Sequence, residues 1–233
     1  MPIRTLGLDA DDTLWHNESV FHLTQGKFLD LLGAYGDAEM SMARLLAVES
    51  RNLALYGYGI KGFTLSMIET AIELSGGKVS AAVIEAILTI GREMLQHPVE
   101  TLPDVEATLH RLKDAGYRLV LVTKGDLLDQ EQKLARSGLG DYFDHIEIVS
   151  EKTAATYRRI FAADLAAGAG AAMIGNSLRS DILPAIEAGL WGIHIPYHLT
   201  WAHEHAEPPT ETERFVQLQG FGGLPDWLAR NRA

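Results

Sequence analysis

The chain has 233 residues, of which 47% are hydrophobic and 22% charged, which suits one large domain or one domain with an insertion. Its 20 Lys and Arg against 31 Asp and Glu give a formal net charge of −11, and no basic cluster is present, which disfavours a protein that binds the nucleic-acid backbone. The absence of cysteine excludes disulfides, thiolate nucleophiles and cysteine-based zinc sites. No targeting segment and no membrane span is visible, so we expect a cytoplasmic protein without a membrane partner.

Residues 3–8 form a short apolar run that ends in acidic residues, a pattern typical of a buried strand with polar groups at its carboxyl end. From about residue 19 to residue 96, apolar residues recur at helical spacing, for example Val20, Leu23, Phe28 and Leu31. Glycines interrupt this pattern at several places. The segment therefore predicts about four helices and no strand.

After residue 98 the pattern alternates between helix and strand. Helices are predicted over 104–115, 127–137, 153–165 and 180–188, and strands over 117–122, 145–149, 171–174 and 191–195. Such alternation indicates βαβ units, hence a parallel sheet with helices on both faces, which the first strand joins. We therefore expect an α/β core made of residues 1–15 and 98–233, with an all-helical unit, residues 16–97, inserted after the first strand. The polar tail over 207–219 precedes apolar residues that we expect to pack on the core, namely Phe221, Leu224, Trp227 and Leu228.

Polar residues follow the predicted strands. Because ligands of open parallel sheets bind at the carboxyl ends of the strands, these residues are the candidates for a functional site. Several carboxylates, one lysine and one hydroxyl at a single edge suit a divalent cation and a phosphate group. The residues, in chain order, are Asp9, Asp11, Asp12, Thr13, Thr123, Lys124, Lys152, Asn176, Ser177 and Asp181.

The chemistry of these residue types suits phosphoryl transfer. With a reference pKa of ~3.9, Asp9 is anionic at neutral pH and can attack phosphorus without a neighbouring base. At ~4 Å, one negative charge and a phosphate dianion repel each other by roughly 2 kcal/mol in water, so cations are needed. We expect Mg²⁺ to be held by Asp9 and the carboxylates after the fourth strand, and Lys152 to add a second positive charge. Asp11, two residues along an extended chain, is placed to protonate the leaving alcohol and later to activate water. The phosphate-binding residues are expected to be Thr123, Lys124 and Lys152.

Asp9-Ala10-Asp11-Asp12-Thr13-Leu14, Thr123, Lys152 and Gly175-Asn176-Ser177 with Asp181 resemble the four ordered motifs of the haloacid dehalogenase superfamily. The helical insertion is similar to its C1 cap. The resemblance implies a Rossmann-like core of strand order 5-4-1-2-3, an aspartyl-phosphate intermediate, Mg²⁺ and a mobile cap. It assigns Asp9 as nucleophile and Asp11 as general acid and base, whose backbone carbonyl also ligates the metal, with Asn176 and Asp181 as further ligands. Asp11 points to a phosphatase acting on a small phosphorylated metabolite, because dehalogenases of this superfamily lack that second acid.

The chain departs from the family pattern at two positions. Asp12 stands where glycine is common, and we interpret it as part of the helix start. Asn176 stands where many members carry a metal-binding aspartate. An amide oxygen can ligate Mg²⁺, but one negative charge is lost, which predicts weaker metal binding than in an Asp version unless Asp181 compensates.

Other interpretations of these residues stay open. The run of Asp9, Asp11 and Asp12 is also compatible with an ordinary acidic turn, and Ser177 with a helix cap. Gly57 to Gly62 matches G-x-G-x-x-G, but a helical pattern precedes it, so we interpret it as a turn. The alternative functions are a phosphonoaldehyde hydrolase that uses a cap lysine such as Lys61, a phosphomutase, and a catalytically weak protein that binds a phosphorylated ligand.

Overall fold

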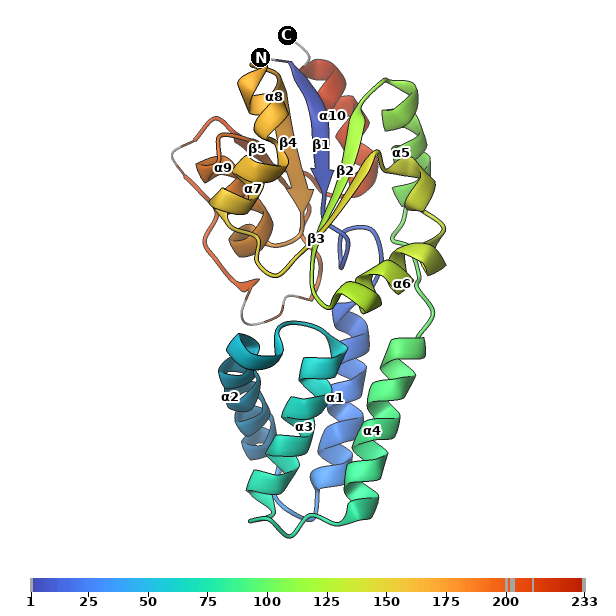
Figure 1. Cartoon of the computed structure of the whole chain (residues 1–233), viewed down its shortest axis with the longest axis vertical. Coiled ribbons are helices and arrows are strands. Elements are labelled where there is room, and N and C mark those ends of the chain that lie inside the picture. Colours follow the sequence, from blue (N-terminus) through green and yellow to red (C-terminus); the bar gives the residue numbers. More distant parts are fainter. Residues whose placement is uncertain (1, 200, 202–203, 211, 232–233) are drawn as a thin grey trace. The chain divides into compact units, whose positions relative to one another are not determined.

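The computed structural model describes residues 2–199, 201, 204–210 and 212–231 (Figure 1). The chain divides into two compact units, one made of residues 1–18, 99–124 and 131–233, and one made of residues 19–98 and 125–130. Among the described residues, no helix combines the length and the apolar character that crossing a bilayer requires.

The first unit contains a six-stranded parallel sheet. Its strands are β1 (Ile3–Leu8), β2 (Arg118–Lys124), β3 (His145–Val149), β4 (Gly170–Gly175), β5 (Trp191–His194) and β6 (Phe215–Gln217), in the order β3-β2-β1-β4-β5-β6. The predicted order 5-4-1-2-3 is therefore confirmed for five strands, read from the opposite edge. The sequence did not predict β6, whose three residues lie in a polar stretch and pair in parallel with β5.

Helices cover both faces of this sheet (Figure 1). They are α5 (Val105–Asp114), α6 (Leu127–Ser137), α7 (Ala154–Ile160), α8 (Ala162–Ala166), α9 (Leu183–Glu187) and α10 (Leu224–Arg230). Strand β2 shows the two faces, since Leu119 and Leu121 pack in the cluster with α5 and α10, whereas Val120 and Val122 pack in the cluster with α7 and α9. Phe221, Leu224, Trp227 and Leu228 pack in the first of these clusters, as predicted.

Two helices of the core differ in detail from the prediction. The helix expected over 153–165 is interrupted at the buried residue Phe161, which ends α7 and precedes α8. The helix expected over 180–188 begins earlier, as a π-helical turn over Leu178–Ile182 that continues into α9. Pro184 lies in the first turn of α9, where its missing N–H group is tolerated.

The second unit is built from four helices, α1 (Glu18–Leu32), α2 (Ala38–Tyr56), α3 (Ile60–Leu74) and α4 (Ala81–Gln96). Its core contains Phe28, Leu45, Phe63 and Met67. The run from Gly57 to Gly62 includes the turn between α2 and α3, where Gly57 and Gly59 have φ angles of 71° and 105° that favour glycine. A turn between helices does not provide the strand-to-helix geometry of a dinucleotide site.

Candidate active site

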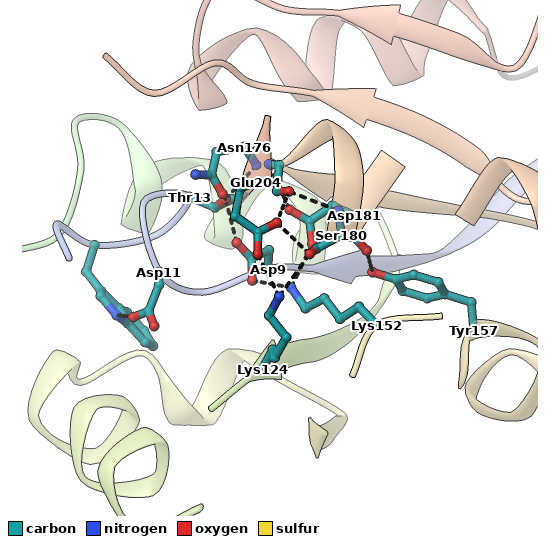
Figure 2. Close-up of polar contacts among 12 residues, drawn as sticks. Asp9, Asp11, Thr13, Lys124, Lys152, Tyr157, Asn176, Ser180, Asp181 and Glu204 are labelled. Carbon is teal, nitrogen blue, oxygen red and sulfur yellow. Dashed lines mark hydrogen bonds and ion pairs between the residues drawn. The ribbon is translucent and has the colours of Figure 1, made fainter. Parts of the chain in front are cut away.

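A buried lysine joins two buried aspartates at the carboxyl edge of the sheet. Leu8, the last residue of β1, pairs with Leu121 of β2 and Ile174 of β4, so Asp9 follows at the middle of the edge. The ammonium group of Lys152 donates to Asp9 Oδ1 and, at 2.7 Å, to Asp181 Oδ1. Figure 2 shows Lys152 reaching this pair of carboxylates. The structure thus brings together three of the residues that the sequence singled out.

Burial changes the proton affinity of Asp9 and of Lys152. The side chains of Asp9, Lys152 and Asp181 are at most 8% exposed. Burial and the negative charge of Asp181 raise the pKa of Asp9 above its usual range, and Lys152 opposes this rise. Burial alone lowers the pKa of Lys152, but the two carboxylates raise it more strongly. From the sequence, Asp9 was expected to be ionised at neutral pH like any carboxylate. In the folded chain its ionisation depends on the positive charge of Lys152.

Thr13 connects Asp9 to the loop after β4. Its hydroxyl lies 3.1 Å from Asp9 Oδ2 and 3.3 Å from Asn176 Oδ1, and it accepts a hydrogen bond of 3.1 Å from the backbone N–H of Asn176. A hydroxyl has one proton, so it donates to one of the two side-chain oxygens at a time. Thr13 thereby fixes the separation between the loop and Asp9.

The loop after β4 is shaped around Asp181. The backbone N–H of Ser177 donates to Asp181 Oδ2 at 3.0 Å, and Asp181 is fully buried. A Cβ at Gly175 would lie 2.2 Å from the same oxygen, so a side chain there would displace the carboxylate. Ser177 also accepts from the backbone N–H of Ser180 at 2.9 Å, which confirms its interpretation as a helix cap.

Asp11 and Asp12 differ in their surroundings. The carboxylate of Asp11 accepts from Trp15 Nε1 at 2.8 Å and from Lys133 Nζ at 3.1 Å, and Figure 2 shows it apart from Asp9. Asp12 accepts from the backbone N–H groups of Asn17 and Glu18 at 2.9 and 3.0 Å, at the start of α1, as the helix-start interpretation predicted. Its φ of 59° lies in the left-handed region that favours glycine.

The structure places the three residues expected to bind phosphate in two groups, one near Asp9 and one around Glu204. Thr123 is buried at the end of β2, and Lys152 contacts Asp9. Lys124 instead donates to Glu204 Oε1 at 2.6 Å and to Ser180 Oγ at 3.0 Å. The sequence analysis did not single out Glu204, because it lies between β5 and β6 and belongs to no motif.

A second missed residue supports the loop after β4. His194 ends β5 and is buried, with Nε2 at 2.9 Å from the backbone oxygen of Asn176. Its Nδ1 lies 3.2 Å from the side-chain amide of Gln217 in β6. The signal for His194 was present in the sequence, since it lies near the carboxyl end of the strand predicted over 191–195, at the edge where the other candidate residues gather.

The residues expected to ligate Mg²⁺ are Asp9, Asp11, Asn176 and Asp181, and their oxygen atoms are the donors that this ion prefers. Among the described residues, no group of three or more His, Asp or Glu side chains is arranged to hold a metal ion. The contacts give a reason, because Lys152 lies between two of the carboxylates and Asp11 is held by Trp15 and Lys133. The carboxylates of Asp9 and Asp181 with the ammonium group of Lys152 leave a net negative charge, so these oxygen donors still fit a divalent cation.

Comparisons with known proteins agree with the geometry. A family model described as haloacid dehalogenase-like hydrolase matches residues 3–189. The crystal structure of a haloacid dehalogenase-like family hydrolase from Xanthomonas campestris is 41% identical, with a TM-score of 0.85 over 99% of this chain and 92% of that one.

Two relatives carry more specific names. A glyceraldehyde 3-phosphate phosphatase of Methanothermobacter thermautotrophicus is 34% identical over 45% of this chain, and the match spans 49% of the relative's length. The pyrimidine 5′-nucleotidase YjjG of Escherichia coli is 26% identical over 78% of this chain and 81% of its own length. The chain thus matches about half the length of the archaeal phosphatase and most of the length of the nucleotidase.

Proposed function

The chain belongs to the haloacid dehalogenase-like hydrolases, and from this we propose that it hydrolyses a phosphomonoester of a small metabolite through an aspartyl-phosphate on Asp9. The observation that carries the proposal is the hydrogen-bonded contact between Lys152 and Asp9 at the middle of the sheet edge. Two relatives are named as a phosphatase and a nucleotidase, and these names support the same reaction class.

In the proposed reaction an oxygen of Asp9 attacks phosphorus, and the bond between phosphorus and the ester oxygen breaks. Asp11 donates a proton to the leaving alcohol, and it later takes a proton from the water that hydrolyses the aspartyl-phosphate. Lys152 and Thr13 orient Asp9, since both donate to its carboxylate. Trp15 and Lys133 fix the orientation of Asp11.

The proposed cofactor is Mg²⁺, held by side-chain oxygens of Asp9, Asn176 and Asp181 and by the backbone carbonyl of Asp11. When bound, the ion supplies positive charge that offsets the repulsion between a carboxylate and a phosphate dianion. Thr123 and Lys152 are proposed to hold phosphoryl oxygens. The helices over residues 16–97 are proposed to form the cap that selects the substrate.

The structure offers no support for an imine at Lys61. Its ammonium group donates to Asp126 Oδ1 at 2.8 Å within the second unit, and this bond lowers the pKa of Asp126 despite partial burial. A lysine that forms an imine reacts as the neutral amine, whereas an ion pair stabilises the charged form. A phosphatase is therefore the better supported of these two alternatives.

The test is hydrolysis of para-nitrophenyl phosphate with and without Mg²⁺. We expect turnover that requires the metal and falls at least about a thousandfold in Asp9→Asn, which removes the attacking oxygen anion but keeps the shape of the side chain. Asp104→Asn, at an acidic residue with a φ of 64° next to α5, is the control and should keep full activity. Turnover that persists in Asp9→Asn would contradict the proposal.

A further inference from the structure

Three donors converge on the carboxylate of Glu204. Lys124 Nζ donates to Glu204 Oε1 at 2.6 Å, and the hydroxyls of Ser177 and Ser180 both donate to Glu204 Oε2, the second at 2.5 Å. Figure 2 shows Glu204 close to Lys124 and Ser180, beside Asp9. One ammonium group and two hydroxyls around a single anion are the composition of an anion-binding site.

The donors are held in place without Glu204. Lys124 ends β2, and its ammonium group also contacts Ser180 Oγ at 3.0 Å. The backbone oxygen of Ser180 accepts from the hydroxyl of the buried Tyr157 at 3.0 Å, and Ser177 caps the π-helical turn. The site is thus built from the sheet edge and the loop after β4, whereas Glu204 comes from the segment between β5 and β6.

The contact is well shielded from water. The side chains of Lys124 and Glu204 are 11% and 16% exposed. Burial alone raises the pKa of Glu204, but Lys124 and the two hydroxyls lower it more strongly, so the carboxylate stays ionised at neutral pH. A buried carboxylate without such donors is costly, which shows how strongly this site stabilises negative charge.

The same donors adjoin the groups of the proposed reaction. Lys124 follows Thr123 in the chain, and Ser177 follows Asn176 and donates its backbone N–H to Asp181 at 3.0 Å. A phosphate group that reaches Asp9 therefore arrives beside a site already filled by a carboxylate. Two anions close together in a shielded site repel each other.

We propose that Lys124, Ser177 and Ser180 form a binding site for a phosphate group of substrate or product, and that Glu204 is an internal anion that occupies this site and competes with the phosphate. Within its own segment, the backbone N–H of Glu204 donates to the backbone oxygen of Trp201 at 2.8 Å. Its displacement leaves every strand pair of the sheet intact, because β5 ends at His194 and β6 begins at Phe215.

The test is calorimetric binding of inorganic phosphate to the full chain. We expect Glu204→Gln, which removes the charge but keeps the size, to bind phosphate about tenfold more tightly than the unchanged chain, equivalent to about 1.4 kcal/mol. Glu207→Gln, an exposed glutamate of the same segment, is the matched control and should bind like the unchanged chain. An affinity of Glu204→Gln within twofold of the unchanged chain, or weaker, would overturn the proposal.

Further variants test the proposal if Glu204→Gln does not fold. Glu204→Ala should also bind phosphate more tightly, and adding Lys124→Met to either variant should abolish the gain, because the competing phosphate then lacks its ammonium partner. A gain that survives Lys124→Met would overturn the assignment of this site. The inference rests on the proposed function in taking the anion from substrate or product, but binding requires no turnover, so a failed phosphatase assay and a failed binding experiment are separate results.

Discussion

The two units of the chain differ in the partners of their buried carboxylates. In the first, the buried carboxylates Asp9 and Asp181 share the ammonium group of Lys152. In the second, Glu49 of α2 is 7% exposed, and its Oε2 has no hydrogen-bond partner among the described residues. The ion pairs of the second unit lie near the surface, as in Lys27 with Glu93.

The difference reflects what each charge does. Buried ion pairs contribute little net stability compared with apolar residues, so a paired cluster such as that of Lys152 is explained by chemistry more readily than by folding. Glu49 keeps its proton to a higher pH than an exposed glutamate, since burial raises its pKa to about 7. Four predictions test this contrast, ordered by the size of the expected effect.

Lys152→Met should lower the free energy of unfolding by roughly 3–5 kcal/mol without divalent cations, because it leaves two buried carboxylates without a positive partner. Urea unfolding with a chelator present measures this change. Lys113→Met, which breaks the more exposed pair with Asp144, is the control and should lower the free energy by less than about 1 kcal/mol. Equal losses in the two variants would remove the contrast between buried and surface pairs.

Glu49 should make the second unit less stable as pH rises. Its pKa is raised from 4.5 to about 7, so between these values the folded chain keeps a proton that the unfolded chain has released. The free energy of unfolding therefore falls with increasing pH across this window, by roughly 3 kcal/mol in total, and this contribution is constant below and above it. Urea unfolding of the unchanged chain and of Glu49→Gln at several pH values measures the effect.

In that experiment the stability difference between the two chains should change by the stated amount between about pH 4 and about pH 8, a range that spans both pKa values. Glu39→Gln, at an exposed position in the first turn of α2, is the control and should show a constant difference. A constant difference for Glu49→Gln as well would mean that water reaches this carboxylate.

Asn176→Asp should tighten Mg²⁺ binding by about tenfold, because it restores a negative charge beside Asp9 and Asp181. Calorimetry in the absence of substrate measures the affinity directly. Asn231→Asp, at the end of α10, adds the same charge elsewhere and should leave the affinity unchanged. Unchanged or weaker binding in Asn176→Asp would speak against Asn176 as a ligand.

Lys27→Met should have the smallest effect. Its ammonium group lies 2.8 Å from Glu93 Oε2, but the two side chains are 59% and 57% exposed, so solvent screens the pair. We expect a loss of less than about 1 kcal/mol in the free energy of unfolding, and less at high salt. A loss as large as that of Lys152→Met would show that exposure does not separate the two classes of ion pair.

The sequence by itself determined the α/β class and the family, and the resemblance to that family implied the order of five strands. Apolar runs with period two or near 3.6 are local properties, so β1 and the four helices of residues 16–97 were predictable from their own residues. The strand ends were equally predictable, because parallel strands present their carboxyl ends at one edge and Asp9, Lys152 and Asp181 each follow a strand.

Only the tertiary structure decided which groups meet. Strand β6 forms because β5 offers it an edge, and its three residues carry no pattern of their own. Glu204 reaches Lys124 across 80 positions of the chain, and no local spacing encodes such a contact. Glu49 lies in an ordinary amphipathic helix, and the burial of its Oε2 without a hydrogen-bond partner in the described part of the chain depends on how the neighbouring helices pack. These features arise from long-range packing, which sets the burial and the partners of a charge and thereby its proton affinity.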